Sequence, residues 1–283
     1  MQLGSPSRTA LSVARQRAAH QLLEQPLIFA DPLALRILGP SAASELRADL
    51  APFTDRLSRG LRAAVVVRSR YAEDELARAR REGIGQYIVL GAGLDTFACR
   101  NPHRELRVFE VDHPATQAWK REQLAAAQLV LPGSARLVAV DFECERAAAP
   151  LAAAGLDWRE RCFISWLGVT VYLPREAVLA TLAELAGVAA SGSRIVFDYA
   201  IEPRLMSPEQ RMGYELLAGR AAAVGEPWRS EFDPQALRGE LVRLGYQDLE
   251  DLGAAQLNQR YFGARADGFV LRGTSRLLRA QRA

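Results

Sequence analysis

The apolar positions of the chain change their spacing after residue 82. Residues 9–24 and 61–82 carry apolar side chains every three or four positions, which is typical of amphipathic helices. From residue 86 onward, short β-favouring runs alternate with helical stretches instead. We therefore expect an N-terminal helical cap and lead-in helix over residues 1–82, followed by a core over residues 83–283.

The second part of the chain predicts a mostly parallel sheet. Five β-favouring runs, separated by helical stretches, are found at residues 86–90, 106–112, 136–141, 162–168 and 193–200. Strands separated by helices imply parallel strands covered on both faces. Residues 201–232 are too long for a bare loop and predict an inserted helical segment. Late strands at residues 246–252 and 268–273 complete a seven-stranded α/β sheet with an antiparallel hairpin at one edge.

The first strand runs directly into a loop that contains two glycines. Gly91 and Gly93 stand one residue apart, as in loops that bring a nucleotide-like ligand to the carboxyl end of a buried parallel strand. A dinucleotide-binding fingerprint would have a third glycine where Thr96 stands. Because glycine also serves tight turns, the loop predicts either a nucleotide-binding turn or a turn without a ligand.

Acidic residues end the next two strands. Glu110 and Asp112 lie about 20 residues after Gly91, a spacing at which an acid can accept hydrogen bonds from ribose hydroxyls. Asp141 ends the third strand beside Phe142, and this pair can hold an adenine amino group and ring. Aspartate also ends strands because it favours turns, so a purely structural interpretation of Asp141 stays open.

Composition narrows the classes of function. The 283 residues are 49% hydrophobic, which suffices for a large core. The 36 basic and 33 acidic residues are interspersed, so the net charge of +3 does not indicate nucleic-acid binding. Cys99, Cys144 and Cys162 lack metal-ligand spacing and indicate reduced thiols in a cytoplasmic protein without a bound metal. Apolar runs are too short or too charged to predict export or membrane insertion.

Several motifs together resemble a known family. They are residues 68–71 (RSRY), 91–96 (GAGLDT), 109–114 (FEVDHP) and 168–174 (GVTVYLP), with residues 17–20 and 29–34 nearer the start. The combination is similar to the leucine carboxyl methyltransferase-like family, which includes bacterial O-methyltransferases. The resemblance covers about residues 9–200. It implies a Rossmann-like class I methyltransferase fold and S-adenosyl-L-methionine as the cofactor.

The matched positions imply a cofactor site. Its residues would be Arg68, Gly91, Gly93, Asp95, Asp112, Asp141 and Phe142. Arg68 would bind the methionine carboxylate, a role that suits a permanently charged guanidinium with parallel donors. Asp112 rather than Glu110 would meet the ribose, Asp141 with Phe142 would flank the adenine, and Asp95 would support the loop or contact the cofactor. The family has an acid where Leu167 stands, so one cofactor contact is missing or replaced.

The methyl acceptor is left open by the sequence. In-line transfer requires a nucleophile placed against the sulfonium methyl group and the exclusion of water. A carboxylate acceptor needs no base, whereas a hydroxyl acceptor benefits from one. The possible bases are His20, His103 and His113, of which His20 is the best placed because it lies in the N-terminal helical region, with a surface or core histidine as the alternative. Candidate pocket residues are Arg17, Tyr172, Met206 and Tyr214, although residues of these types more often serve simple packing than ligand contact. We expect O-methylation of a small molecule, and the oligomeric state stays open.

Two other functions compete with this interpretation. An NAD(P)-dependent oxidoreductase would share the strand, the Gly-x-Gly loop and the downstream acid, but Thr96 and the acid that ends the third strand argue against it. A non-catalytic module that binds S-adenosylmethionine or a protein partner is the second alternative. It is motivated by Leu167 at the family's acidic position and by the lack of an obvious base.

Overall fold

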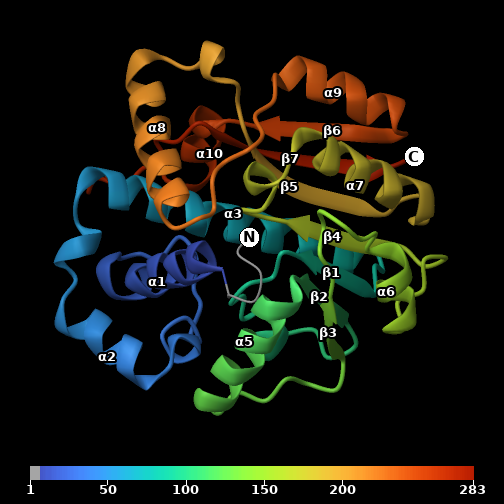
Figure 1. Cartoon of the computed structure of the whole chain (residues 1–283), viewed down its shortest axis with the longest axis horizontal. Helices are drawn as coiled ribbons and strands as arrows, with labels where there is room; N and C mark the ends of the chain where they lie inside the picture. Colours follow the sequence, from blue (N-terminus) through green and yellow to red (C-terminus); the bar gives the residue numbers. More distant parts are fainter. Residues whose placement is uncertain (1–6) are drawn as a thin grey trace.

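A seven-stranded sheet forms the centre of the molecule in the computed structural model, which describes residues 7–283 (Figure 1). The strands are β1 (Gln86–Leu90), β2 (Arg107–Asp112), β3 (Ala135–Ala139), β4 (Cys162–Trp166), β5 (Arg194–Ala200), β6 (Tyr246–Leu252) and β7 (Ser275–Arg282). Their order is β3-β2-β1-β4-β5-β7-β6. The first five are parallel, and β7 runs antiparallel to both β5 and β6. The order reverses between β1 and β4, so their carboxyl ends open the crevice in which such sheets bind ligands.

Helices cover both faces of this sheet. They are α1 (Arg8–Leu23), α2 (Pro40–Ala48), α3 (Arg56–Arg81), α4 (Phe97–Arg100), α5 (Pro114–Ala126), α6 (Ala148–Ala153), α7 (Arg175–Val188), α8 (Pro208–Ala223), α9 (Pro234–Arg243) and α10 (Ala254–Tyr261). Apolar side chains of α6, α7 and α9 pack on one face, and those of α3 and α10 on the other. The predicted Rossmann-like α/β fold is confirmed. In residues 7–283, none of these helices is long and apolar enough to cross a membrane.

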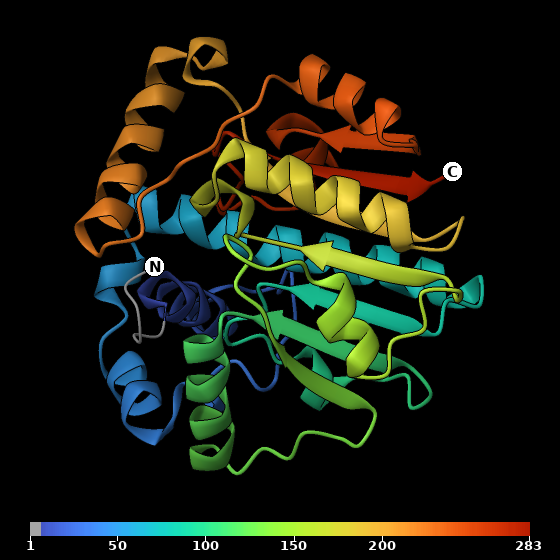
Figure 2. The same ribbon diagram turned by 45° about the vertical axis from the view of Figure 1, so that its right-hand side comes forward.

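The helices α1 and α8 lie beyond the carboxyl ends of the parallel strands. In Figure 2 the arrowheads of the central strands point towards α1, in dark blue, and α8, in orange. α1 belongs to the N-terminal helical region, and α8 to the predicted insertion at residues 201–232. Segments that are far apart in the sequence therefore lie beyond the same ends of the parallel strands.

The helix α3 begins earlier than the spacing of its apolar residues predicts. The Asp55 carboxylate accepts hydrogen bonds from the backbone N–H groups of Leu57 and Ser58 at 2.9 and 3.0 Å, which caps the first turn. At the other end, Gly83 has a φ of +88°, a left-handed conformation that commonly follows a helix. The resulting 26-residue helix brings Arg68 to the carboxyl ends of the strands.

The last strand was predicted in the wrong place. Residues 268–273 form no strand, and β7 follows them. Phe269 and Leu271 are buried there, and the backbone of Leu271 bonds to the side-chain amide of Asn258 at 2.8 and 2.9 Å instead of to a neighbouring strand. β7 was missed because charged residues such as Arg279 interrupt its apolar positions. The antiparallel edge itself is confirmed, with β7 one strand in from the edge.

Candidate functional site

A cavity of about 610 Å³ lies at the carboxyl ends of β1, β2 and β4. Its volume is within the range of about 300 to 1,000 Å³ that is typical of small-molecule and cofactor sites. The lining residues contributed by the strand ends and the loops after them are Gly91, Gly93, Asp95, Asp112, Asp141, Phe142, Leu167 and Gly168. Further walls come from α1, α3, the segment around Tyr172, and Gly225, Glu226, Pro227 and Arg229. The cavity therefore occupies the switch in strand order, where the topology places a ligand.

The loop after β1 depends on two glycines with positive φ. Gly91 has a φ of +67°, and a Cβ atom on it would lie 2.1 Å from Cγ2 of Val169. Gly93 has a φ of +46°, which side chains also disfavour. The N–H groups of Gly91 and Ala92 donate to the carbonyl of Val111 at 2.7 and 3.0 Å, which ties the loop to β2. The backbone can therefore face the cavity without a side chain in between.

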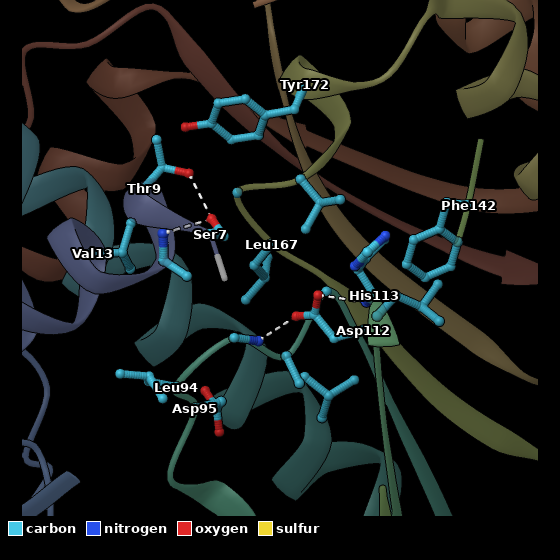
Figure 3. A pocket seen from close by; sticks show the side chains of 18 of the residues that line it. Ser7, Thr9, Val13, Leu94, Asp95, Asp112, His113, Phe142, Leu167 and Tyr172 are labelled. Carbon is cyan, nitrogen blue, oxygen red and sulfur yellow. Dashed lines mark hydrogen bonds between the residues drawn. The ribbon is translucent and has the colours of Figure 1, made fainter. Parts of the chain in front are cut away.

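Asp112, at the end of β2, binds the backbone of this loop (Figure 3). Its carboxylate accepts hydrogen bonds from the N–H groups of Gly93 at 2.6 Å and His113 at 2.7 Å. Burial raises the pKa of Asp112 above its usual value, although these two N–H groups act in the opposite direction. A carboxylate has about four acceptor positions, so Asp112 retains capacity for ligand hydroxyls.

Glu110 lies in a different environment from Asp112, although only Val111 separates the two in the sequence. It is completely buried and lies 2.5 Å from the ammonium group of Lys120 on α5. Burial raises the pKa of Glu110, and Lys120 opposes that rise. Only Asp112 of the two acids lines the cavity. It is the last residue of β2, whereas Glu110 lies inside the strand.

Arg68 reaches the cavity from the middle of α3. Its Nη1 atom lies 3.2 Å from Oδ2 of Asp198, and the other oxygen of Asp198 accepts a 2.5 Å hydrogen bond from the N–H of Gly168. A Cβ atom on Gly168 would lie 2.3 Å from Nη2 of Arg68, so the missing side chain makes room for the guanidinium. Asp198 could not be predicted from the sequence motifs, because it lies inside β5 and belongs to none of them.

Arg17 joins the helical cap to the glycine loop. Its guanidinium lies 3.0 Å from the Asp31 carboxylate and 3.4 Å from that of Asp95, and it also donates to the carbonyl of Leu94. Burial would raise the pKa of Asp95, but Arg17 and Arg100 hold it below its usual value. Arg17 was predicted as a substrate-pocket residue. It lines the cavity, but its charge is engaged by these two carboxylates.

The residues at the end of β3 form the outer part of the cavity. Asp141 and Phe142 both line it, as does His113. Asp141 lies 3.8 Å from Nε2 of His113, and the Phe142 ring packs against Trp166 with centroids 6.1 Å apart. An aromatic ring and a half-exposed carboxylate therefore stand side by side.

Three of the predicted residues lie outside the cavity lining. His20 is completely buried; its Nδ1 lies 2.9 Å from the Glu24 carboxylate, and its Nε2 accepts a hydrogen bond from the N–H of Ile28 at 3.1 Å. Both ring nitrogens are engaged within the cap, so His20 does not face the cavity in this structure. Met206 and Tyr214 pack together in a small apolar cluster near α8 and do not reach the cavity.

Tyr172 does line the cavity, from the 3₁₀ turn η3 (Thr170–Tyr172). Its ring lies across the cavity from Asp112, close to Thr9 on α1 (Figure 3). Burial raises the pKa of the Tyr172 phenol above its usual value. The phenol is therefore a hydrogen-bonding group at neutral pH and not a base.

Sequence comparison decides the family. The sequence model described as leucine carboxyl methyltransferase matches residues 10–186, more than half of the chain. The chain belongs to the leucine carboxyl methyltransferase family. The chain is 32% identical to YktD of Bacillus subtilis (strain 168), which is named as an inferred S-adenosyl-L-methionine-dependent methyltransferase. The match covers 94% of this chain and 95% of YktD. A Frankia alni protein with a name of the same kind is 34% identical over 84% and 82% of the two chains.

Solved structures agree with this family member in fold. A protein from Thermobifida fusca, named as an inferred methyltransferase, has a TM-score of 0.62 at 16% identity and covers 99% of this chain and 96% of its own. A DUF574 family protein from Streptomyces avermitilis has a TM-score of 0.61 at 17% identity over 99% and 98% of the two chains. The predictions of an S-adenosylmethionine-dependent methyltransferase and of its cofactor are confirmed.

The described residues offer no obvious metal site. Among residues 7–283, no group of three or more His, Cys, Asp or Glu side chains is arranged to hold a metal ion. Cys99, Cys144 and Cys162 are free thiols. The polar groups that line the cavity include carboxylates, arginines and the Tyr172 phenol.

Proposed function

We propose that this enzyme transfers the methyl group of S-adenosylmethionine to an oxygen atom of a small molecule. One observation supports the site above all others. The seven residues that the sequence implicates in cofactor binding all line one cavity, although they come from α3 and from the ends of three different strands. Unrelated turn or surface residues would not be expected to converge in this way.

The three parts of the cofactor have suitable partners along the cavity. We assign Arg68 to the methionine carboxylate, because Asp198 engages one edge of its guanidinium and the planar group has five donors. We assign Asp112 to the ribose hydroxyls, and Asp141 with Phe142 to the adenine. Gly91 fits this assignment because its missing Cβ leaves the backbone open to a ligand.

The bound cofactor would supply an electrophilic methyl group on a sulfonium sulfur. The protein then has to place the acceptor and exclude water. Leu167 projects into the cavity near Asp112 and adds an apolar surface where the family has an acid (Figure 3). Tyr172 can donate a hydrogen bond to the acceptor from the opposite wall.

The lining of the cavity favours an acceptor that is already nucleophilic. Tyr172 keeps its proton, and His20 is buried away from the cavity. His113 accepts a hydrogen bond from the N–H of Ala115 at 3.2 Å through Nδ1, and its Nε2 faces Asp141 at the outer end. A carboxylate needs no base, so we propose a carboxylic acid as the acceptor in preference to an alcohol or phenol.

Calorimetric titration tests the cofactor assignment. We expect binding of S-adenosylmethionine and S-adenosylhomocysteine and none of NADH. Binding of NADH without a response to the sulfur compounds would replace this proposal by the oxidoreductase.

Methyl transfer from labelled S-adenosylmethionine to a panel of small carboxylic acids, alcohols and phenols tests the acceptor class. We expect labelled product only with carboxylic acids. Mild alkali should then release the label as methanol, because it hydrolyses methyl esters. Alkali-stable product would identify an ether and overturn the carboxylate assignment. Cofactor binding without transfer to any compound would favour the non-catalytic module, which Leu167 motivates.

A further inference from the structure

We propose that Glu226 is the latch of a lid that closes one end of the cavity against α1. The lid comprises residues 201–232, which include α8 and the irregular segment after it. Glu226 lies in that segment, lines the cavity and is bonded to residues more than 200 positions away in the sequence. The contact therefore joins the lid to α1 beside the cavity.

The Glu226 carboxylate caps the first turn of α1. It accepts hydrogen bonds from the backbone N–H groups of Arg8 at 2.7 Å and Thr9 at 3.2 Å, and from the hydroxyl of Ser7 at 3.0 Å. The hydroxyl of Thr9 donates to the same carboxylate. The first N–H groups of a helix have no partner within the helix and carry partial positive charge, so a carboxylate is well suited to bind them.

The α1 side of this contact is fixed. Arg17, two turns along the helix, is bound to Asp31, Asp95 and the carbonyl of Leu94. These groups belong to the cap and to the glycine loop. The N-terminal turn of α1 is thus held at a constant position relative to the cavity.

The lid side packs loosely. Met206 and Tyr214 form a small apolar cluster with Ala200, separate from the large clusters on the two faces of the sheet. On the outer surface of α8, Met212 is 68% exposed and Leu216 is 51% exposed. Little apolar surface would become exposed to water if α8 moved, so opening costs less free energy here than in the core.

The segment that carries Glu226 has a pivot on one side and an anchor on the other. Gly225 has a φ of +83° directly after α8 and can absorb a change in backbone direction. The N–H of Arg229 donates to the carbonyl of Val171 at 2.7 Å, and the hydroxyl of Ser230 donates to that of Thr170 at 2.8 Å. When Glu226 releases α1, α8 and residues 226–228 can therefore move, with Gly225 as the pivot between them, while Arg229 and Ser230 hold the end of the lid in place.

Closure by Glu226 controls how fast a ligand leaves and not which ligand is recognised. Arg68, Asp112 and Asp141 do not belong to the lid. The kinetic consequence rests on the proposed cofactor site, whereas the closure itself can be measured in the chain without any ligand.

Hydrogen exchange of the ligand-free protein tests the closure directly. Glu226→Gln removes the charge and keeps the size of the side chain, and Glu215→Gln is the matched control on the exposed side of α8. In Glu226→Gln we expect amide exchange to become about tenfold faster at Arg8 and Thr9, since the lost charge interaction with a helix N-terminus is of that order. Exchange at residues 91–97 should be unchanged. Wild-type exchange at Arg8 and Thr9 would overturn the latch.

Stopped-flow fluorescence then tests the kinetic consequence, with Trp228 on the lid as the reporter. Dissociation of S-adenosylhomocysteine should be about tenfold faster in Glu226→Gln and unchanged in Glu215→Gln. Thr9→Val removes a donor from the opposite side of the contact and should act in the same direction. Unchanged release in both Glu226→Gln and Thr9→Val would contradict the latch, whereas failure of wild-type protein to bind the ligand would contradict the proposed function alone.

Discussion

The cavity has a glycine-loop end, formed by residues 91–97 with α1, and a lid end, formed by residues 224–232. At the glycine-loop end, Arg17, Asp31 and Asp95 form buried ion pairs, and the loop backbone is bonded to β2. At the lid end, hydrogen bonds made by a single carboxylate join the lid to α1. The glycine-loop end is therefore held by buried ion pairs and backbone hydrogen bonds, as the proposed cofactor site requires, and the lid end depends on one carboxylate, as the proposed closure requires.

The difference follows from how each end is anchored. The glycine loop continues from β1, a strand whose five residues are all buried between neighbouring strands. The lid is an insertion between β5 and α9, and its own apolar cluster is small. An element outside the main core can move without opening the core to water, which suits a gate.

Glycine substitutions should separate the two ends most strongly. Gly91→Ala places a Cβ 2.1 Å from Val169 at a φ of +67°, and we expect a loss of about 2 kcal/mol or more in the free energy of unfolding. Gly219→Ala in α8 meets nothing within 4 Å and should raise stability by about 0.5 to 1 kcal/mol. Chemical denaturation of both variants gives the values. Equal effects would remove the distinction between a constrained loop and a permissive lid.

Loss of a cofactor contact should have the next largest effect. Arg68→Ala removes the charged donor assigned to the methionine carboxylate, so we expect the dissociation constant of S-adenosylmethionine to rise about tenfold to a hundredfold. Arg220→Ala, on the exposed surface of the lid, is the control and should leave affinity unchanged. Calorimetry measures both, and wild-type affinity in Arg68→Ala would remove the assignment.

The pH dependence of cofactor binding should reveal Asp112. Burial raises its pKa above the usual 3.8, and the ribose requires the ionised carboxylate as a hydrogen-bond acceptor. Affinity should therefore fall as the pH decreases through this raised pKa, beginning above pH 3.8. Protonation of Asp112 itself favours the folded state, because its pKa is higher there than in the unfolded chain. Asp112 protonation therefore does not cause unfolding that could explain this loss.

Calorimetric titrations at several pH values, with circular dichroism to monitor folding, test this prediction. Asp112→Asn is the comparison variant. It should bind more weakly at neutral pH and should lack this component of the pH dependence. An identical pH profile in wild type and variant would assign the titration to another group.

The smallest effect is expected on the outer surface of the lid. Leu216 is 51% exposed, so Leu216→Gln should change the free energy of unfolding by less than about 0.5 kcal/mol. Thermal unfolding measures the change. A loss of several kcal/mol would mean that this side of α8 is covered, and the description of the lid as loosely packed would fail.

Most of the strands, the glycine loop and the residues proposed for the cofactor could be predicted from the sequence. Strands and amphipathic helices have local apolar patterns, and the motif around Gly91 is contiguous in the chain. β7 could not be predicted in the same way, because arginines interrupt its apolar residues. Its place between β5 and β6 depends on pairing between strands that are distant in the sequence.

Contacts between polar residues that are far apart in the chain could not be predicted in this way. The tertiary structure placed Asp198 behind Arg68, and Glu226 on the first turn of α1, across long distances in the sequence. It also engaged both nitrogens of His20 inside the cap, where no local pattern marks the histidine as structural. A hydrogen bond depends on the positions of two groups in space, and for partners far apart in the chain those positions exist only once the sheet and its helices have packed.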